Sequence, residues 1–75
     1  FIIAIGEHAL KIALPLAERF KAREIRTGMA MTKNGLKEQL GMAHRLGVRF
    51  VVIVGEREVR DKTAIVKDMD FTLLQ

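Results

Sequence analysis

Polar side chains suited to binding an anion or an unpaired base gather in three short stretches of this 75-residue chain. The stretches are Gly6-Glu7-His8, Lys33-Asn34 with the nearby Lys37 and Gln39, and Gly55-Glu56-Arg57. Lysine and arginine pair with phosphate oxygens, while amide and carboxylate groups can hydrogen-bond the exposed edge of an unstacked base. Solubilising surface lysines and a helix-capping asparagine would give the same pattern, and from these residues alone that reading is favoured.

The two histidines, His8 and His44, could act as general bases because their side chains titrate near neutral pH. However, the chain has no serine and no cysteine to serve as a nucleophile. Glu7-His8, Glu56 and Glu58 also lack the spacing of a metal-ligand set. Because the roles of nucleophile, base and oxyanion donor are unfilled, we expect no catalytic residue and no metal site in this chain.

Nucleotide-cofactor motifs are missing as well. The first strand-to-helix turn reads Gly6-Glu7-His8-Ala9, which does not match the GxGxxG fingerprint, and no GxxxxGK[ST] occurs. An acidic residue directly after the glycine would also repel a pyrophosphate. We expect no cofactor in this domain.

The composition is that of a single soluble globular domain, with 49% hydrophobic and 29% charged residues. The net charge of +4 is uneven, since residues 1–54 carry nine Lys or Arg against four Asp or Glu. A positive field over one part of a small domain favours anionic partners such as RNA. No apolar run approaches the roughly 20 residues that span a bilayer, and no targeting signal is visible. We therefore expect a cytoplasmic protein without membrane association.

Hydrophobic periodicity predicts alternating strands and helices. The predicted strands are Phe1–Ile5, Ile25–Met31, Phe50–Val54 and Thr63–Val66, with a turn over Glu56–Lys62 before the last. A helix over about residues 7–23 carries Ala9, Leu10, Ala13, Leu14, Ala17 and Phe20 on one face and is kinked at Pro15; a shorter helix starting at Pro15 is the alternative. Asn34 or Thr32 can cap a second helix, which Gly47 ends in a left-handed conformation.

This element order predicts an α/β fold with a mixed sheet and helices on both faces. Right-handed crossovers place the second strand beside the first and the first beside the third, while the last, short connection makes an antiparallel pair. Ligands of such sheets bind beyond the carboxyl ends of the parallel strands, where the three polar stretches meet. Phe1 and Phe50 are expected to be buried, which argues against an aromatic platform for single-stranded nucleic acid.

The second half of the chain resembles the C-terminal anticodon-binding domain of class II aminoacyl-tRNA synthetases, most closely the histidyl-tRNA synthetase family. The most specific part is Gly55-Glu56-x-Glu58-Val59 followed by Thr63-x-x-Val66-Lys67-Asp68-Met69. Leu36-Lys37-x-Gln39-Leu40, with Ala43 and Leu46-Gly47, is similar to the helix after the second strand in that family.

The resemblance implies a three-layer anticodon-binding-domain-like fold over residues 1–75, truncated before its last strand and helix. It implies that the domain binds the anticodon stem-loop of a histidine-type tRNA, with Lys33, Asn34, Lys37, Gln39, Glu56 and Arg57 as RNA-binding residues. The catalytic domain of the parent enzyme, a homodimer, would join histidine, ATP and tRNA with Mg²⁺. This domain would then have neither catalytic residues nor a cofactor of its own.

Two positions depart from the family pattern. Lys62 stands where the family usually has glycine, so a different turn is open there. Glu38 replaces a common lysine, which weakens phosphate binding at that position. A domain of this fold could alternatively serve protein–protein docking, as in synthetase paralogues that no longer charge tRNA.

Overall fold

In the computed structural model, which describes residues 1–29 and 35–69, the first strand separates two apolar clusters. This strand, β1 (Ile2–Ala4), is buried along its whole length. Ile2 and Ala4 point toward helix α1 (Glu7–Ala22), whereas Ile3 packs with Ala43 of helix α2 (Leu36–Leu46). Because successive strand residues face opposite sides, an unbroken apolar run requires cover on both faces.

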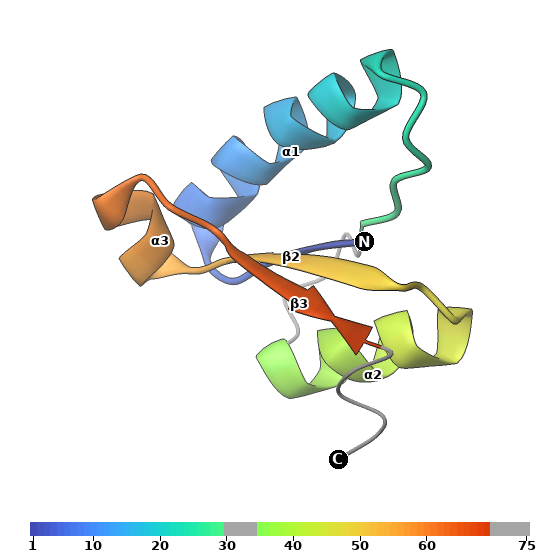
Figure 1. Ribbon diagram of the computed structural model, residues 1–75. Coiled ribbons are helices and arrows are strands. Elements are labelled where there is room, and N and C mark those ends of the chain that lie inside the picture. Colours follow the sequence, from blue (N-terminus) through green and yellow to red (C-terminus); the bar gives the residue numbers. More distant parts are fainter. Residues whose placement is uncertain (30–34, 70–75) are drawn as a thin grey trace.

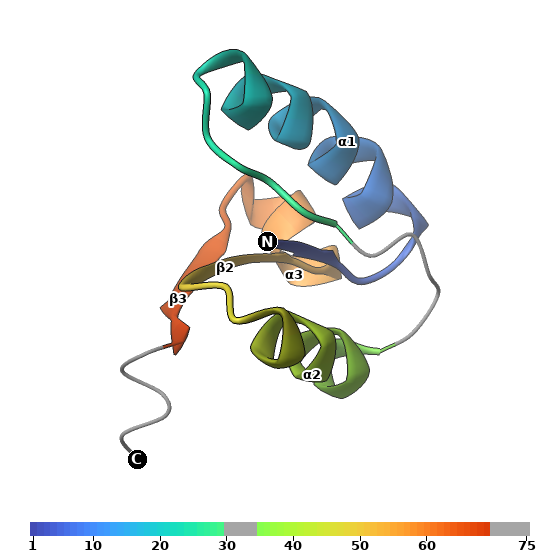
Figure 2. The ribbon, with the colours of Figure 1, turned by 90° about the vertical axis from the view of Figure 1, so that its right-hand side faces the viewer.

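Figure 2 shows the resulting three layers, with α1 on one face of the sheet and α2 on the other. The other strands are β2 (Phe50–Val54) and β3 (Ile65–Asp68), and a short helix, α3 (Glu56–Asp61), joins them. The α/β fold with a mixed sheet covered on both faces is therefore confirmed. Among the described helices, none combines the length and the apolar character needed to cross a membrane.

The sheet has the order β1-β2-β3. β1 and β2 are parallel, with Ile2 opposite Val52, and β2 and β3 are antiparallel, with Phe50 opposite Asp68. The six-residue helix between β2 and β3 is too short for a crossover to a parallel position, so the antiparallel pairing follows. This confirms the predicted parallel core with an antiparallel strand beside it.

The predicted strand over Ile25–Met31 is wrong as an extended element within the described residues. There it is reduced to one parallel bridge between Met29 and Ile2, while residues 30–31 lie outside the described ranges. The amide of Ile25 is occupied instead by the end of α1, donating to the Phe20 carbonyl at 3.0 Å. The backbone amide of Ile5 donates to Val54 in β2, whereas the amide of Ile2, which points to the opposite edge of the strand, donates to Gly28. The bridge therefore lies on the side of β1 away from β2, as the predicted strand order requires.

Helix α1 runs continuously from Glu7 to Ala22 and includes Pro15, so the single helix is confirmed over its shorter alternative. Its buried residues are the alanines Ala9, Ala13 and Ala17, which allow the helix to lie close to the sheet. Leu14, expected on the same stripe, is 43% exposed. For α2 the residue at the N-cap position is Gly35, and the predicted caps Thr32 and Asn34 lie outside the described residues.

The predicted turn over Glu56–Lys62 is wrong, because Glu56–Asp61 form α3 and Lys62 follows its end. The carboxylate of Glu58 accepts a hydrogen bond from the Gly55 amide at 2.9 Å and so satisfies a donor at the start of the helix. The spacing Gly55-x-x-Glu58 is a helix-start signal that was available in the sequence. The last strand accordingly begins at Ile65 rather than at Thr63.

Each of the three helices in the described part of the chain ends with a residue in the left-handed region. Gly47 closes α2 with φ 71°, as predicted, and the Val48 amide reaches the Ala43 carbonyl in the pattern of a Schellman motif. Two non-glycine residues adopt the same left-handed conformation: Glu24 after α1 with φ 61° and Lys62 after α3 with φ 57°. The turn at Lys62 thus has the conformation that glycine adopts most easily, although the residue differs from the family pattern.

Replacing these two residues by glycine should stabilise the fold. Left-handed backbone costs an L-residue about 1–2 kcal/mol, partly offset by the greater freedom of glycine in the unfolded chain. We expect Glu24→Gly and Lys62→Gly each to raise the free energy of unfolding by about 0.5–1 kcal/mol in urea titrations. Gly47→Ala is the matched control and should lower the free energy of unfolding by about 1 kcal/mol. Equal stability of all three variants would contradict the left-handed conformation of Glu24 and Lys62.

Candidate nucleic-acid interface

The candidate site lies where the parallel strands β1 and β2 end. Because both strands run in one direction, the residues that follow them, Gly6–His8 and Gly55–Arg57, meet at the same edge of the sheet. Figure 1 shows the first turn of α1 beside α3 at this edge. His8 Nδ1 lies 3.7 Å from Glu56 Oε2, and both side chains are mostly exposed. The predicted meeting of these two stretches is confirmed. We call this edge of the sheet the carboxyl edge.

Gly6 permits this close approach. Its backbone has φ 102° and ψ 161°, a region open to glycine and strained for other residues. A Cβ atom at Gly6 would overlap the carboxylate of Glu56 and lie 3.3 Å from its Cδ. The glycine therefore allows the chain to turn from β1 into α1 while the Glu56 side chain packs over the turn.

Glu56 and Arg57 occupy the first turn of α3, and both are exposed. The turn is held by the hydrogen bond between Glu58 and the Gly55 amide described above. Glu58 thus positions the site, although it is not among the predicted RNA-binding residues. Its signal was the three-residue spacing from Gly55.

Gln39 has a different role from the predicted one. Its side chain is buried, with 1% exposure, and its Nε2 donates to the carbonyl of Ala4 at 3.1 Å. The bond fixes the beginning of α2 against the end of β1. Direct contact between this side chain and RNA does not fit its burial, so Gln39 is a positioning residue in this structure.

Lys37 is exposed on the first turn of α2, two residues before the buried Gln39. This places it near the end of β1, on the face of the sheet opposite to α1. Lys33 and Asn34 lie outside the described residues, so the structure does not test their placement.

Exposed charges of both signs surround the carboxyl edge. Among the described residues they include the cations Lys37 and Arg57 and the anions Glu7, Glu38 and Glu56. A mixed set suits base edges, which present both donors and acceptors, better than it suits phosphate alone. Within residues 1–29 and 35–69 no three His, Cys, Asp or Glu side chains come together in a way that could hold a metal ion.

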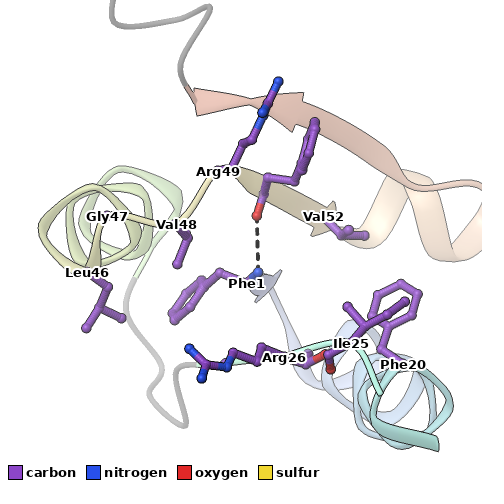
Figure 3. A pocket seen from close by; sticks show the side chains of 12 residues that line it. Phe1, Phe20, Ile25, Arg26, Leu46, Gly47, Val48, Arg49 and Val52 are labelled. Atoms are coloured by element: carbon purple, nitrogen blue, oxygen red, sulfur yellow. Dashed lines mark hydrogen bonds between the residues drawn. The ribbon is translucent and has the colours of Figure 1, made fainter. Parts of the chain in front are cut away.

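A second feature of the structure lies at the opposite, amino end of the sheet. An open hollow of about 770 Å³ is lined by Phe1, Phe20 and Phe50, among others. The backbone nitrogen of Phe1 donates a hydrogen bond to the Phe50 carbonyl at 3.1 Å, drawn as a dashed line in Figure 3. The expectation that Phe50 is buried is wrong, because this residue is 49% exposed.

Substitution of Gly6 tests the packing of the carboxyl edge. Gly6→Ala should lower the free energy of unfolding by about 1–3 kcal/mol, because it combines backbone strain with the overlap at Glu56. The control is Gly41→Ala in α2, where the nearest atom to an added Cβ is Arg45 Nη1 at 3.8 Å. That helical site should gain up to about 1 kcal/mol. Unchanged stability of Gly6→Ala in thermal or urea unfolding would contradict the geometry.

Substitution of Gln39 separates a positioning role from RNA contact. Gln39→Met keeps the side-chain length but leaves the Ala4 carbonyl without this donor, which should cost about 1–3 kcal/mol of unfolding free energy. RNA affinity, measured where the variant remains folded, should change less than about twofold. A variant of unchanged stability and weakened RNA binding would instead restore the predicted contact.

Comparison with known proteins agrees with the geometry. The family model described as "Anticodon binding domain" matches residues 1–73. Histidine–tRNA ligase of Lysinibacillus sphaericus is 36% identical over 70 residues, and that of Aquifex aeolicus is 40% identical over 73 residues. In both cases the match covers 93% of this chain and 17% of the relative.

A histidine–tRNA ligase of Pyrococcus furiosus is similar over the same share of this chain, with 29% identity over 70 residues. The chain thus spans about a sixth of the length of the curated relatives that it matches. The match of the family model includes both stretches of the carboxyl edge and the two parallel strands that bring them together. This chain belongs to the anticodon-binding domain family.

Proposed function

We propose that this chain binds the anticodon stem-loop of a histidine-type tRNA and positions that tRNA for a catalytic domain elsewhere in a longer protein. The observation that carries the proposal is the match to the anticodon-binding domain over residues 1–73. The names of the similar histidine–tRNA ligases support the histidine type, whose anticodon is GUG. The exposed carboxyl edge, with donors and acceptors side by side, offers a surface for this RNA.

Some of the described residues contact the RNA, and others keep the contacting residues in position. Glu56 and Arg57 face the bases, because they project from the first turn of α3 beside His8. Lys37 pairs with phosphate at the start of α2, and Lys33 and Asn34 precede it in the chain. Gln39, Glu58 and Gly6 act inside the fold by fixing α2, α3 and the turn after β1.

The longer protein would use ATP and Mg²⁺ in a separate catalytic domain to join histidine to tRNA, as a homodimer in the cytoplasm. The domain described here would contribute affinity and anticodon selection and would itself need no cofactor. Its own residues then bind and orient the RNA, while bond formation belongs to the other domain.

Binding to two stem-loops tests the proposal. The affinity of the 75-residue chain is measured for a GUG anticodon stem-loop and for one with a scrambled anticodon, at two salt concentrations. A preference for GUG that persists at the higher salt supports base reading. Equal binding that falls with salt at a log–log slope of about −0.7 per phosphate contact would reduce the interaction to general attraction and contradict the proposal.

A lysine substitution tests the position of the RNA on the domain. Lys37→Gln should weaken GUG stem-loop binding roughly threefold to tenfold, as expected for a lost contact of about 0.5–1.5 kcal/mol. The salt slope should become shallower by about 0.7. Lys21→Gln is the control, because Lys21 lies in the last turn of α1 at the far end from the carboxyl edge. Equal losses from both substitutions would contradict the placement.

A docking function without tRNA charging is the second candidate. It is favoured by the exposure of apolar residues on β3, where Ile65 is 49% and Val66 is 66% exposed. Indifference of RNA binding to Lys37→Gln, together with self-association that Val66→Glu abolishes in analytical ultracentrifugation, would favour this candidate over the first.

A further inference from the structure

The Glu56 carboxylate is restrained at the carboxyl edge and is still open to solvent. Its side chain is 62% exposed, and its Oε2 lies 3.7 Å from Nδ1 of His8. The same side chain lies against the backbone of Gly6, where an added Cβ would overlap Oε1 and lie 3.6 Å from Cγ. His8 belongs to the first turn of α1 and Glu56 to that of α3, which lie side by side in Figure 1. Two separate segments thus hold one exposed acceptor group.

The other glutamate of α3, Glu58, serves the fold instead. Its Oε1 accepts a partly buried hydrogen bond from the Gly55 amide at 2.9 Å, which closes the start of α3. The Glu56 carboxylate faces the His8 side chain of another helix, and that side chain is itself 71% exposed. Because an ion pair between exposed groups adds little to stability, the contact between His8 and Glu56 is not needed to keep the domain folded. Glu56 is therefore the carboxylate of α3 that a ligand can reach.

Guanine is the base whose Watson–Crick edge matches a carboxylate. An ionised carboxylate only accepts hydrogen bonds, and it offers two oxygens side by side. Guanine presents two adjacent donors on that edge, N1–H and the N2 amino group, whereas adenine, cytosine and uracil each present a donor beside an acceptor. A carboxylate therefore forms two parallel hydrogen bonds with guanine, but it faces an acceptor on each of the other three bases.

We propose that Glu56 reads a guanine of the anticodon loop through its N1–H and N2–H donors, and that His8 is the positioning residue that holds the carboxylate for this contact. The inference rests on the proposed function and names the base that the carboxyl edge selects. The histidine-type anticodon GUG offers a guanine on either side of its uridine. Hydrogen bonds from these donors to a carboxylate are charge-assisted, so each is stronger than a bond between neutral groups.

The test uses GUG stem-loops in which each guanine is replaced in turn by inosine. Inosine lacks only the N2 amino group of guanine, so the replacement removes one of the two donors and keeps the rest of the edge. At one of the two positions inosine should weaken binding to the unaltered 75-residue chain by about tenfold, as expected for one lost hydrogen bond to a charged group. Fluorescence anisotropy of the labelled stem-loops at a fixed salt concentration gives the affinities.

Substitutions at the pair then assign the inosine penalty to its residues. Glu56→Gln should reduce the penalty to less than about twofold, because the glutamine amide has a single acceptor oxygen. Glu7→Gln is the matched control: it removes the same charge from an exposed glutamate at the same edge and should keep the penalty. His8→Leu should reduce the penalty, whereas His8→Asn should retain it, because the asparagine amide can donate from near the position of Nδ1. Thermal unfolding establishes that each variant is folded at the titration temperature.

The outcomes separate this inference from the proposed function. If the unaltered chain does not prefer GUG over the scrambled anticodon, the proposed function fails and guanine reading fails with it. If the chain prefers GUG but tolerates inosine at both positions, or if Glu56→Gln keeps the penalty, anticodon binding stands and guanine reading by Glu56 is overturned. Equal loss of the penalty in Glu7→Gln would reduce the effect to the charge of the edge and also overturn it. An unchanged penalty in His8→Leu would overturn the positioning role of His8.

Discussion

The parallel pairing of β1 and β2 is the constraint on which the rest of the structure depends. Both strands are apolar and lie between two helices; β1 is buried along its whole length, β2 is exposed at Phe50, and Ile2, Ile3 and Val51 are fully inaccessible to solvent. Their register, Ile2 opposite Val52 and Ala4 opposite Val54, makes the two strands end together. The turns that follow must therefore share one edge, and that edge brings His8 to Glu56 although the two residues are far apart in the sequence.

The same pairing gives the sheet two ends of different chemistry. At the carboxyl edge helices begin, so exposed carboxylates and cations mix around backbone amides, and Gly6 accommodates the Glu56 side chain. At the amino end α1 and α2 finish, and Arg26 and Arg49 line a hollow together with phenylalanines, of which Phe50 is exposed. Helix ends favour this distribution, since acidic residues stabilise the first turn and basic residues the last. The direction of the helices thus separates an edge of mixed charge from an end of the sheet where the described charged residues lining the hollow are arginines.

Much of this arrangement could be predicted from the sequence, because periodicity and glycines encode it locally. The double-sided burial of β1, the left-handed Gly47 and the meeting of Gly6 with Gly55 followed from residue patterns alone. Three features depend on tertiary context instead. Gln39 has a polar side chain of the kind usually found on the surface, but it is buried and donates a hydrogen bond to the Ala4 carbonyl. Phe50 belongs to an apolar run yet is exposed, because its position at the start of β2 lies beside an open hollow. Within the described residues, the segment after α1 pairs only at Met29, because the amide of Ile25 completes the helix end.

We propose that the anticodon loop lies on the carboxyl edge. Amide chemical-shift mapping of the ¹⁵N-labelled chain with the GUG stem-loop tests it most directly. We expect the largest shifts on Gly6–His8, Lys37 and Gly55–Arg57, with smaller shifts on the outer face of β3. Largest shifts on Ile65–Asp68, with the amides of Gly6–His8 and Gly55–Arg57 unmoved at saturation, would contradict it.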